Sequence, residues 1–154
     1  MRKVFVRLSV LFILFSVSGL AQKRNTTEKD LFDFVWVGDP QVSPDGSSVA
    51  FVKVTVNAKK DGYDTSIWNV STNGNEEPRR LTSGIRDSAP RWSPDGKFLA
   101  FVRAGEVPGP ASAPQIYLLP MSGGEAFQLT NLPRGAGGAQ QGRNRRGCGM
   151  RIRR

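Results

Sequence analysis

Two stretches of the chain repeat the same order of apolar and polar positions. Residues 40–52 read PQVSPDGSSVAFV and residues 90–102 read PRWSPDGKFLAFV, with the shared letters all at a shift of 50. The second halves also correspond, since IWNV at 67–70 matches IYLL at 116–119 and each copy ends in Leu-Thr. Repetition at this period indicates a chain built from two copies of one structural unit.

The Ser-Pro-Asp-Gly phrase inside each copy predicts a tight turn between two strands. Proline presets φ at the second turn position, Asp is tolerated at the third, and Gly accepts a left-handed conformation at the fourth. After the second turn, Phe98, Ala100 and Val102 share one face of a strand, whereas Leu99 and Phe101 share the other. Because both faces are apolar, we expect this strand to belong to a sheet packed between two neighbouring sheets.

Each copy is expected to form a four-stranded antiparallel sheet, with later strands of the second copy at 115–120 and 127–130. Units of about 40 to 50 residues with four strands are the blades of a β-propeller. We therefore predict an all-β fold, a partial β-propeller of about two four-stranded antiparallel blades, at 40–82 and 90–130. A hairpin-rich sandwich is the alternative, and the second copy of the motif favours the propeller. The side chains expected to be largely buried are Trp92, Phe98, Phe101, Val102, Ile116, Leu118 and Leu129.

The first residues have the three parts of a secretory signal peptide. A basic start precedes an apolar run at 8–17, and Gly-Leu-Ala at 19–21 offers small residues for cleavage. The run is shorter than the roughly 20 residues of a membrane span, which disfavours an uncleaved anchor helix. We expect a signal peptide at 1–21 and a mature chain from Gln22 that is periplasmic or secreted, with no membrane attachment after cleavage.

A lead-in segment is expected at 22–39, before the first repeat. Residues 27–34, TEKDLFDF, predict a short helix within it. Thr27 can cap this helix, and the acidic Glu28 and Asp30 favour its first turn.

The formal net charge of +9 is a property of the two ends of the chain. Residues 1–21 hold three basic side chains and 134–154 hold seven arginines, without any acidic residue in either segment. Between them, residues 22–133 contain twelve basic and thirteen acidic side chains, a net charge of 12 − 13 = −1. The middle of the chain therefore has no basic stripe for a phosphate backbone, and no nucleic-acid partner is expected.

The repeats resemble the WD-like propeller repeats of bacterial exported proteins. The phrase Leu31-Phe32-Asp33, the short helix and the early first blade are similar to the N-terminal propeller of prolyl oligopeptidase family serine peptidases, in particular the acylaminoacyl-peptidase and dipeptidyl-peptidase-like branch. This resemblance implies a propeller that filters substrates or docks a hydrolase domain, so that a peptide substrate or that domain is its partner. The alternative is a non-catalytic Tol-type or other WD-like propeller that binds a protein or ligand. The Tol protein carries an α/β domain before its blades, for which this sequence leaves no room.

The resemblance places the Ser-Asp-His triad in a C-terminal α/β-hydrolase domain that we expect to be missing here. The sequence contains no histidine and no G-x-S-x-G motif, so the chain cannot form such a triad itself. We therefore assign no catalytic, cofactor-binding or metal-binding residue. The chain alone is expected to be inactive.

Three sequence features suggest other sites and are given a structural interpretation instead. The pair Glu76-Glu77, which could grip a substrate amine, lies in a polar loop and is expected to be solvated. Asp45 and Asp95 are single carboxylates in turns, without the oxygen cluster that calcium needs. The glycosylation triplets at Asn25 and Asn69 are interpreted as chance, because the resemblance is bacterial.

The repeat pattern stops where a third blade should begin, near residue 141. Residues 139–154, AQQGRNRRGCGMRIRR, have no turn motif, no alternation and no acidic residue, and the single cysteine, Cys148, cannot form a disulfide within the chain. We expect a disordered Arg/Gly-rich tail, either a genuine basic segment for anionic surfaces or, as the position of the break favours, an out-of-frame translation. The nucleotide sequence would separate the two, because a shifted frame near codon 139 would restore Trp-Ser-Pro-Asp-Gly. Two blades are fewer than the four to eight or so of a closed propeller, so we expect an unstable chain.

Overall fold

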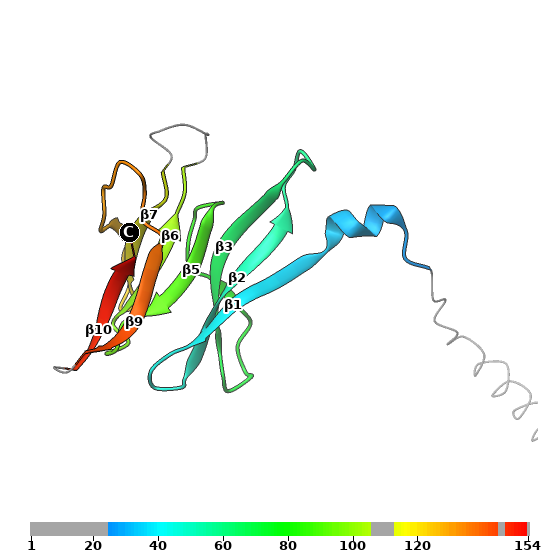
Figure 1. Cartoon of the computed structure of the whole chain (residues 1–154). Helices are drawn as coiled ribbons and strands as arrows, with labels where there is room; N and C mark the ends of the chain where they lie inside the picture. The colour runs from blue at the N-terminus through cyan, green and yellow to red at the C-terminus, as the bar shows by residue number, and fades with distance from the viewer. Residues whose placement is uncertain (1–24, 106–112, 145–146, 154) are drawn as a thin grey trace, which may run out of the picture. The chain divides into compact units, whose positions relative to one another are not determined.

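The computed structural model describes residues 25–105, 113–144 and 147–153 (Figure 1). The chain divides into two compact units, Met1–Asp30 and Leu31–Arg154. The signal peptide expected at 1–21 lies outside the described residues. Within the described ranges, no helix is long and apolar enough to cross a membrane.

Two four-stranded antiparallel sheets make up most of the second unit (Figure 1). The first sheet has the order β1-β2-β3-β4 and the second has the order β5-β6-β7-β8, so each follows the chain without a crossover. The all-β prediction and the two-sheet prediction are confirmed. A short 3-10 helix, η1, precedes them where a helix was predicted. The bounds are η1 Glu28–Asp33, β1 Val35–Val42, β2 Ser48–Val56, β3 Tyr63–Ser71, β4 Arg79–Arg80, β5 Asp87–Trp92, β6 Phe98–Arg103, β7 Gln115–Pro120 and β8 Phe127–Gln128.

The turn motif folds for the local reason that its residues predict. In the first sheet the Gly46 N–H donates to the Ser43 carbonyl at 2.9 Å, and Gly46 has a φ of 74°. The Ser43 hydroxyl donates to Asp45 Oδ1 at 2.6 Å and accepts the Ser48 N–H at 3.0 Å. The second sheet repeats this network from Ser93. The motif therefore closes each hairpin with its own side chains.

The first strand of each four-stranded sheet, β1 and β5, carries a β-bulge at the same place in the repeat. The β1–β2 register shifts between Gly38 and Gln41, and the β5–β6 register shifts between Ser88 and Arg91. In β5 the bulged Ala89 adopts a φ of 51°, which is strained for an alanine. The bulge accommodates the proline that follows it in each copy, because proline cannot donate to the strand ladder. The ladder continues beyond the bulge to the pair of Val35 with Thr55, so β1 begins inside the segment expected to be a lead-in.

The main core lies between the two sheets. Ala50 and Ile67 of the first sheet pack in one buried cluster with Leu99, Phe101 and Leu119 of the second. The Trp92 indole joins the cluster and donates its Nε1–H to the Gln41 carbonyl at 2.9 Å. The sheets are therefore held face to face by apolar burial, by this hydrogen bond and by an ion pair in which Arg91 of β5 donates to Asp39 of β1 at 2.7 Å.

Most of the burial predictions hold, and one is wrong. Trp92, Phe101, Val102 and Ile116 are buried, and the side chains of Phe98 and Leu118 are half-buried. Leu129, in contrast, is 43% exposed. Leu129 follows β8 at the outer edge of the sheet, where its N–H donates to the Ile116 carbonyl at 2.8 Å while its side chain stays open to solvent.

The tail expected to be disordered forms a third, two-stranded antiparallel sheet, with β9 Gly138–Asn144 and β10 Gly147–Arg153. β9 contacts β5, β6 and β7 of the second sheet (Figure 1). Just before it, Ala136 is buried against Val102 and Ile116, and Leu132 packs on the same cluster. The open apolar face of the second sheet therefore acquires a cover, which the sequence pattern did not predict.

Candidate functional site

An ion pair between neighbouring strands forms one wall of the candidate site. Arg103, at the end of β6, donates from Nε to Asp87 Oδ1 at 2.7 Å and from Nη2 to Asp87 Oδ2 at 2.8 Å. The ion pair is therefore bidentate. Asp87 begins β5 and is 0% exposed. The two residues are direct partners in the β5–β6 register, so the sheet holds them side by side.

Two further features hold this arginine in place. Its guanidinium lies 5.3 Å from the Phe101 ring and 5.0 Å from the Tyr117 ring, within the range of cation–π attraction. Gly84 passes so close that a Cβ there would lie 2.6 Å from the Asp87 carboxylate oxygens. The close approach therefore requires glycine at position 84.

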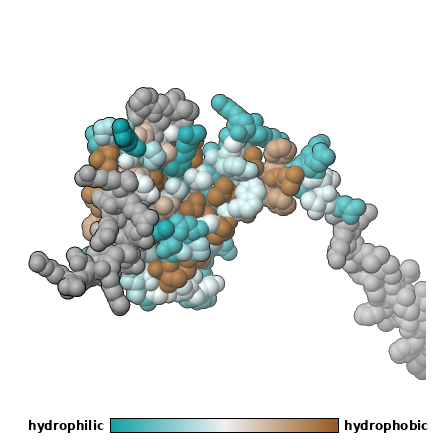
Figure 2. All heavy atoms as spheres, in the orientation of Figure 1, coloured by the Kyte–Doolittle hydropathy of each residue, from teal (hydrophilic) through white to brown (hydrophobic). Residues whose placement is uncertain are grey.

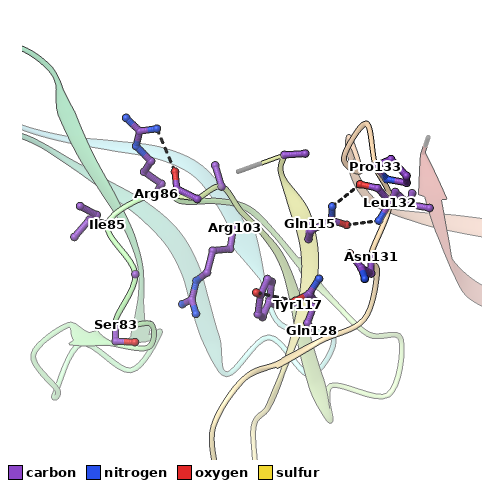
Figure 3. A pocket seen from close by; sticks show the side chains of 14 residues that line it. Ser83, Ile85, Arg86, Arg103, Gln115, Tyr117, Gln128, Asn131, Leu132 and Pro133 are labelled. Carbon is purple, nitrogen blue, oxygen red and sulfur yellow. Dashed lines mark hydrogen bonds between the residues drawn. The ribbon is translucent and has the colours of Figure 1, made fainter. Parts of the chain in front are cut away.

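The ion pair opens into a cavity of about 470 Å³ at this end of the second sheet (Figure 3). Arg103 points into the cavity from one side, and Tyr117 and Gln128 lie across from it, joined by a 3.2 Å hydrogen bond from the Tyr117 hydroxyl to Gln128 Oε1 (Figure 3). Arg86 contributes a second guanidinium, which donates to the Gly105 carbonyl at 3.3 Å.

The loop after β8 closes the far side of the cavity. Gln115 Nε2 donates to the Leu132 carbonyl at 2.7 Å, and Gln115 Oε1 accepts the Leu132 N–H at 3.0 Å. The cavity therefore presents two guanidinium groups, one of them neutralised by Asp87, together with amide and hydroxyl groups. Such a lining can hold carbonyl or carboxylate groups through hydrogen bonds.

The residues that the sequence suggested for other sites do not line this cavity. Glu76 and Glu77 are both exposed in the loop between β3 and β4, as expected. Asn69 is buried within β3, where a glycan has no room, whereas Asn25 is exposed. The described part of the chain holds no group of three or more His, Cys, Asp or Glu side chains arranged to ligate a metal.

Asp45 and Asp95 act as caps of their turns. The Ser43 hydroxyl, with further help from Ser47, lowers the pKa of Asp45 from its usual 3.8 to about 2. The Ser93 hydroxyl and the Lys97 N–H lower the pKa of Asp95 in the same way. Both carboxylates are therefore ionised at neutral pH.

The cavity at Arg103 escaped the sequence analysis because its residues come from four separate segments. A signal was nevertheless present in the repeat. Asp87 and Arg103 correspond to Val37 and Lys53 at the shift of 50, so the second copy carries an acid–base pair where the first carries an apolar residue and a base.

Comparison with known proteins identifies the architecture. No protein-family model matches the chain. Among curated proteins, the uncharacterized peptidase YuxL of Bacillus subtilis (strain 168) is 40% identical over 113 residues, which are 73% of this chain and 17% of YuxL. The chain thus spans about a sixth of the length of this relative.

Solved structures agree on the fold. An acylaminoacyl peptidase of Pyrococcus horikoshii superposes with a TM-score of 0.61 at 22% identity, over 76% of this chain and 17% of that enzyme. The β-propeller domain of the Trilobed protease from Pyrococcus furiosus, described as having an open velcro topology, superposes with a TM-score of 0.54 at 23% identity, over 69% of this chain and 31% of that domain. The two four-stranded sheets are therefore propeller blades. Over about 70% of its length the chain resembles peptidase YuxL in sequence and the propeller of acylaminoacyl peptidases in fold, which confirms the resemblance to a prolyl oligopeptidase family propeller.

Proposed function

We propose that this chain supplies propeller blades to an exported serine peptidase, in which the propeller filters peptide substrates or docks the hydrolase domain. The 40% identity to YuxL over 113 residues carries this proposal, because a match of that length is longer than either blade alone. The site chemistry supports the same role. The cavity beside Arg103 offers hydrogen-bond donors and charge for peptide groups, and peptide hydrolysis is assigned to a hydrolase domain.

A blade exchange tests this proposal. The 113-residue segment of YuxL that matches this chain is replaced by the corresponding segment of this chain, and hydrolysis is measured on a panel of acyl- and dipeptidyl-chromogenic substrates. The chimera is expected to stay within about tenfold of YuxL in kcat/KM, because related blades preserve the interface to the hydrolase domain. The chain by itself is expected to give the rate of buffer.

Two results would count against the peptidase role. One is a chimera that elutes as a folded monomer and hydrolyses none of the substrates that YuxL hydrolyses. The other is hydrolysis that co-purifies with the chain alone and disappears on a point mutation within it. A chimera that also carries Arg103→Met serves as the control for blade folding.

Export of the chain is the second part of the proposal, and it rests on the signal-like residues 1–21. Residues 1–30 fused to an alkaline phosphatase that lacks its own signal are expected to give phosphatase activity in a bacterial host, because that enzyme needs an oxidising compartment for its disulfides. Ile13→Arg, which interrupts the apolar run, should abolish the activity, and Asn25→Arg outside the run should not. Equal activity of the two variants would refute export through this segment.

A further inference from the structure

A second cavity, of about 710 Å³, lies between the Ser-Pro-Asp-Gly turns of the two blades. Three carboxylates, of Asp45, Asp95 and Glu76, line it together with one guanidinium, of Arg79. The acidic side chains of the lining therefore outnumber the basic one by two. The cavity therefore favours a positively charged occupant.

Asn69 gives an independent indication that something binds there. Its side chain lines the same cavity and the residue is 8% exposed. Asn69 Oδ1 is the buried side-chain atom that lacks a hydrogen-bond partner among the described residues. A buried acceptor without a donor is costly and calls for an explanation, of which an absent donor group is one.

The repeat shows that the fold does not require this asparagine. Asn69 lies opposite Ala50 in the first blade, and Leu118 lies opposite Ala100 at the same place in the second blade. Leucine at this position packs without an unsatisfied polar atom. An asparagine that costs stability where leucine is compatible with the blade is typical of a binding position.

Part of the cavity wall is apolar. Trp92 and Met121 line it, and the Trp92 indole N–H is already committed to the Gln41 carbonyl. This wall can pack against the methylene groups of a long side chain while the charged end reaches polar partners.

We propose that this cavity binds a lysine side chain of a peptide or protein segment. The ammonium group donates to Asn69 Oδ1 and is balanced by the excess of carboxylates, and the methylenes lie against Trp92 and Met121. A free peptide N-terminus carries the same ammonium group, so the test separates the two sources. The inference does not depend on the peptidase role, because it is measured as binding to the full chain without hydrolysis.

Titration calorimetry with three capped or free tripeptides tests the proposal. Acetyl-Ala-Lys-Ala-amide is expected to bind saturably, and acetyl-Ala-norleucine-Ala-amide, which has a similar shape without the charge, about tenfold more weakly or not at all. Ala-Ala-Ala-amide presents only the N-terminal ammonium. Stronger binding of the lysine peptide than of this peptide supports a side-chain site, whereas the reverse order overturns it. Equal binding of the lysine and norleucine peptides also overturns it.

Matched variants locate the site. Asn69→Leu removes the acceptor by installing the residue of the second blade, so it is expected to abolish the preference for lysine over norleucine while raising the urea midpoint of unfolding. Glu76→Gln should weaken lysine binding about threefold, and the adjacent Glu77→Gln, which lies outside the cavity lining, should leave it unchanged. Unchanged lysine binding in Asn69→Leu, in a variant that unfolds cooperatively, would place the peptide elsewhere and refute the proposal.

Discussion

Arg103→Met is expected to lower the free energy of unfolding by about 3–5 kcal/mol, because it leaves a fully buried carboxylate without its partner. Asp87 is 0% exposed and receives both charge-assisted hydrogen bonds from Arg103. Methionine keeps an apolar side chain next to the rings of Phe101 and Tyr117, so the loss reports mainly the missing guanidinium. Urea unfolding followed by tryptophan fluorescence at low protein concentration measures it.

Two further variants separate the ion pair from other causes. Arg86→Met removes an exposed guanidinium from the same cavity and is expected to cost less than about 0.5 kcal/mol. The double variant Asp87→Leu with Arg103→Met should recover most of the stability, since an apolar pair can replace a buried ion pair. If Arg103→Met is no more destabilising than Arg86→Met, the ion pair is not what holds these strands.

Val37→Asp is expected to weaken self-association of the chain, raising its dissociation constant by at least about threefold, because it interrupts an exposed apolar strip. Val37 is 64% exposed in β1, and Val35, Trp36 and Tyr63 are exposed nearby. Figure 2 shows hydrophobic surface around the start of β1. β1 is also an edge strand, whose free backbone groups can pair with another chain.

The repeat itself suggests the substituted residue. Val37 lies opposite Lys53 in β2, where the second blade has Asp87 opposite Arg103. An aspartate at 37 therefore gains a basic partner across the strands, so its cost to folding is small. Sedimentation velocity over a concentration series measures the association, and Ser122→Asp, in an exposed turn, controls for added charge. Equal association of Val37→Asp and the unmodified chain would show that another surface drives it.

The local structure of this protein was determined by its sequence. Each Ser-Pro-Asp-Gly turn closes through bonds among residues at most five apart, so its residues specify its geometry. The continuous apolar run at 98–102 is typical of a strand buried on both faces, and the repetition of both features predicted two four-stranded sheets. These features need no knowledge of distant segments, because the interactions that create them are local.

Other features required the tertiary structure. The site at Arg103 depends on the register of β5 against β6 and on a bulge at Ala89, and register is set by the pairing of whole strands. Pro40 and Pro90 marked the bulges in the sequence, but the partner strand shows where the ladder shifts. Leu129 was expected to be buried from its apolar character, yet it lies past the end of the outer strand.

The tail and the second cavity show the same division. Residues 138–144 and 147–153 carry no strand pattern, yet they pair as β9 and β10, and β9 contacts β5, β6 and β7 of the second blade. In the sequence Asn69 is a polar residue of an expected strand, and only the packing of the two blades shows that it is buried. Burial and hydrogen-bond satisfaction are properties of the surroundings that a fold builds around a residue, so they were decided by the tertiary structure alone.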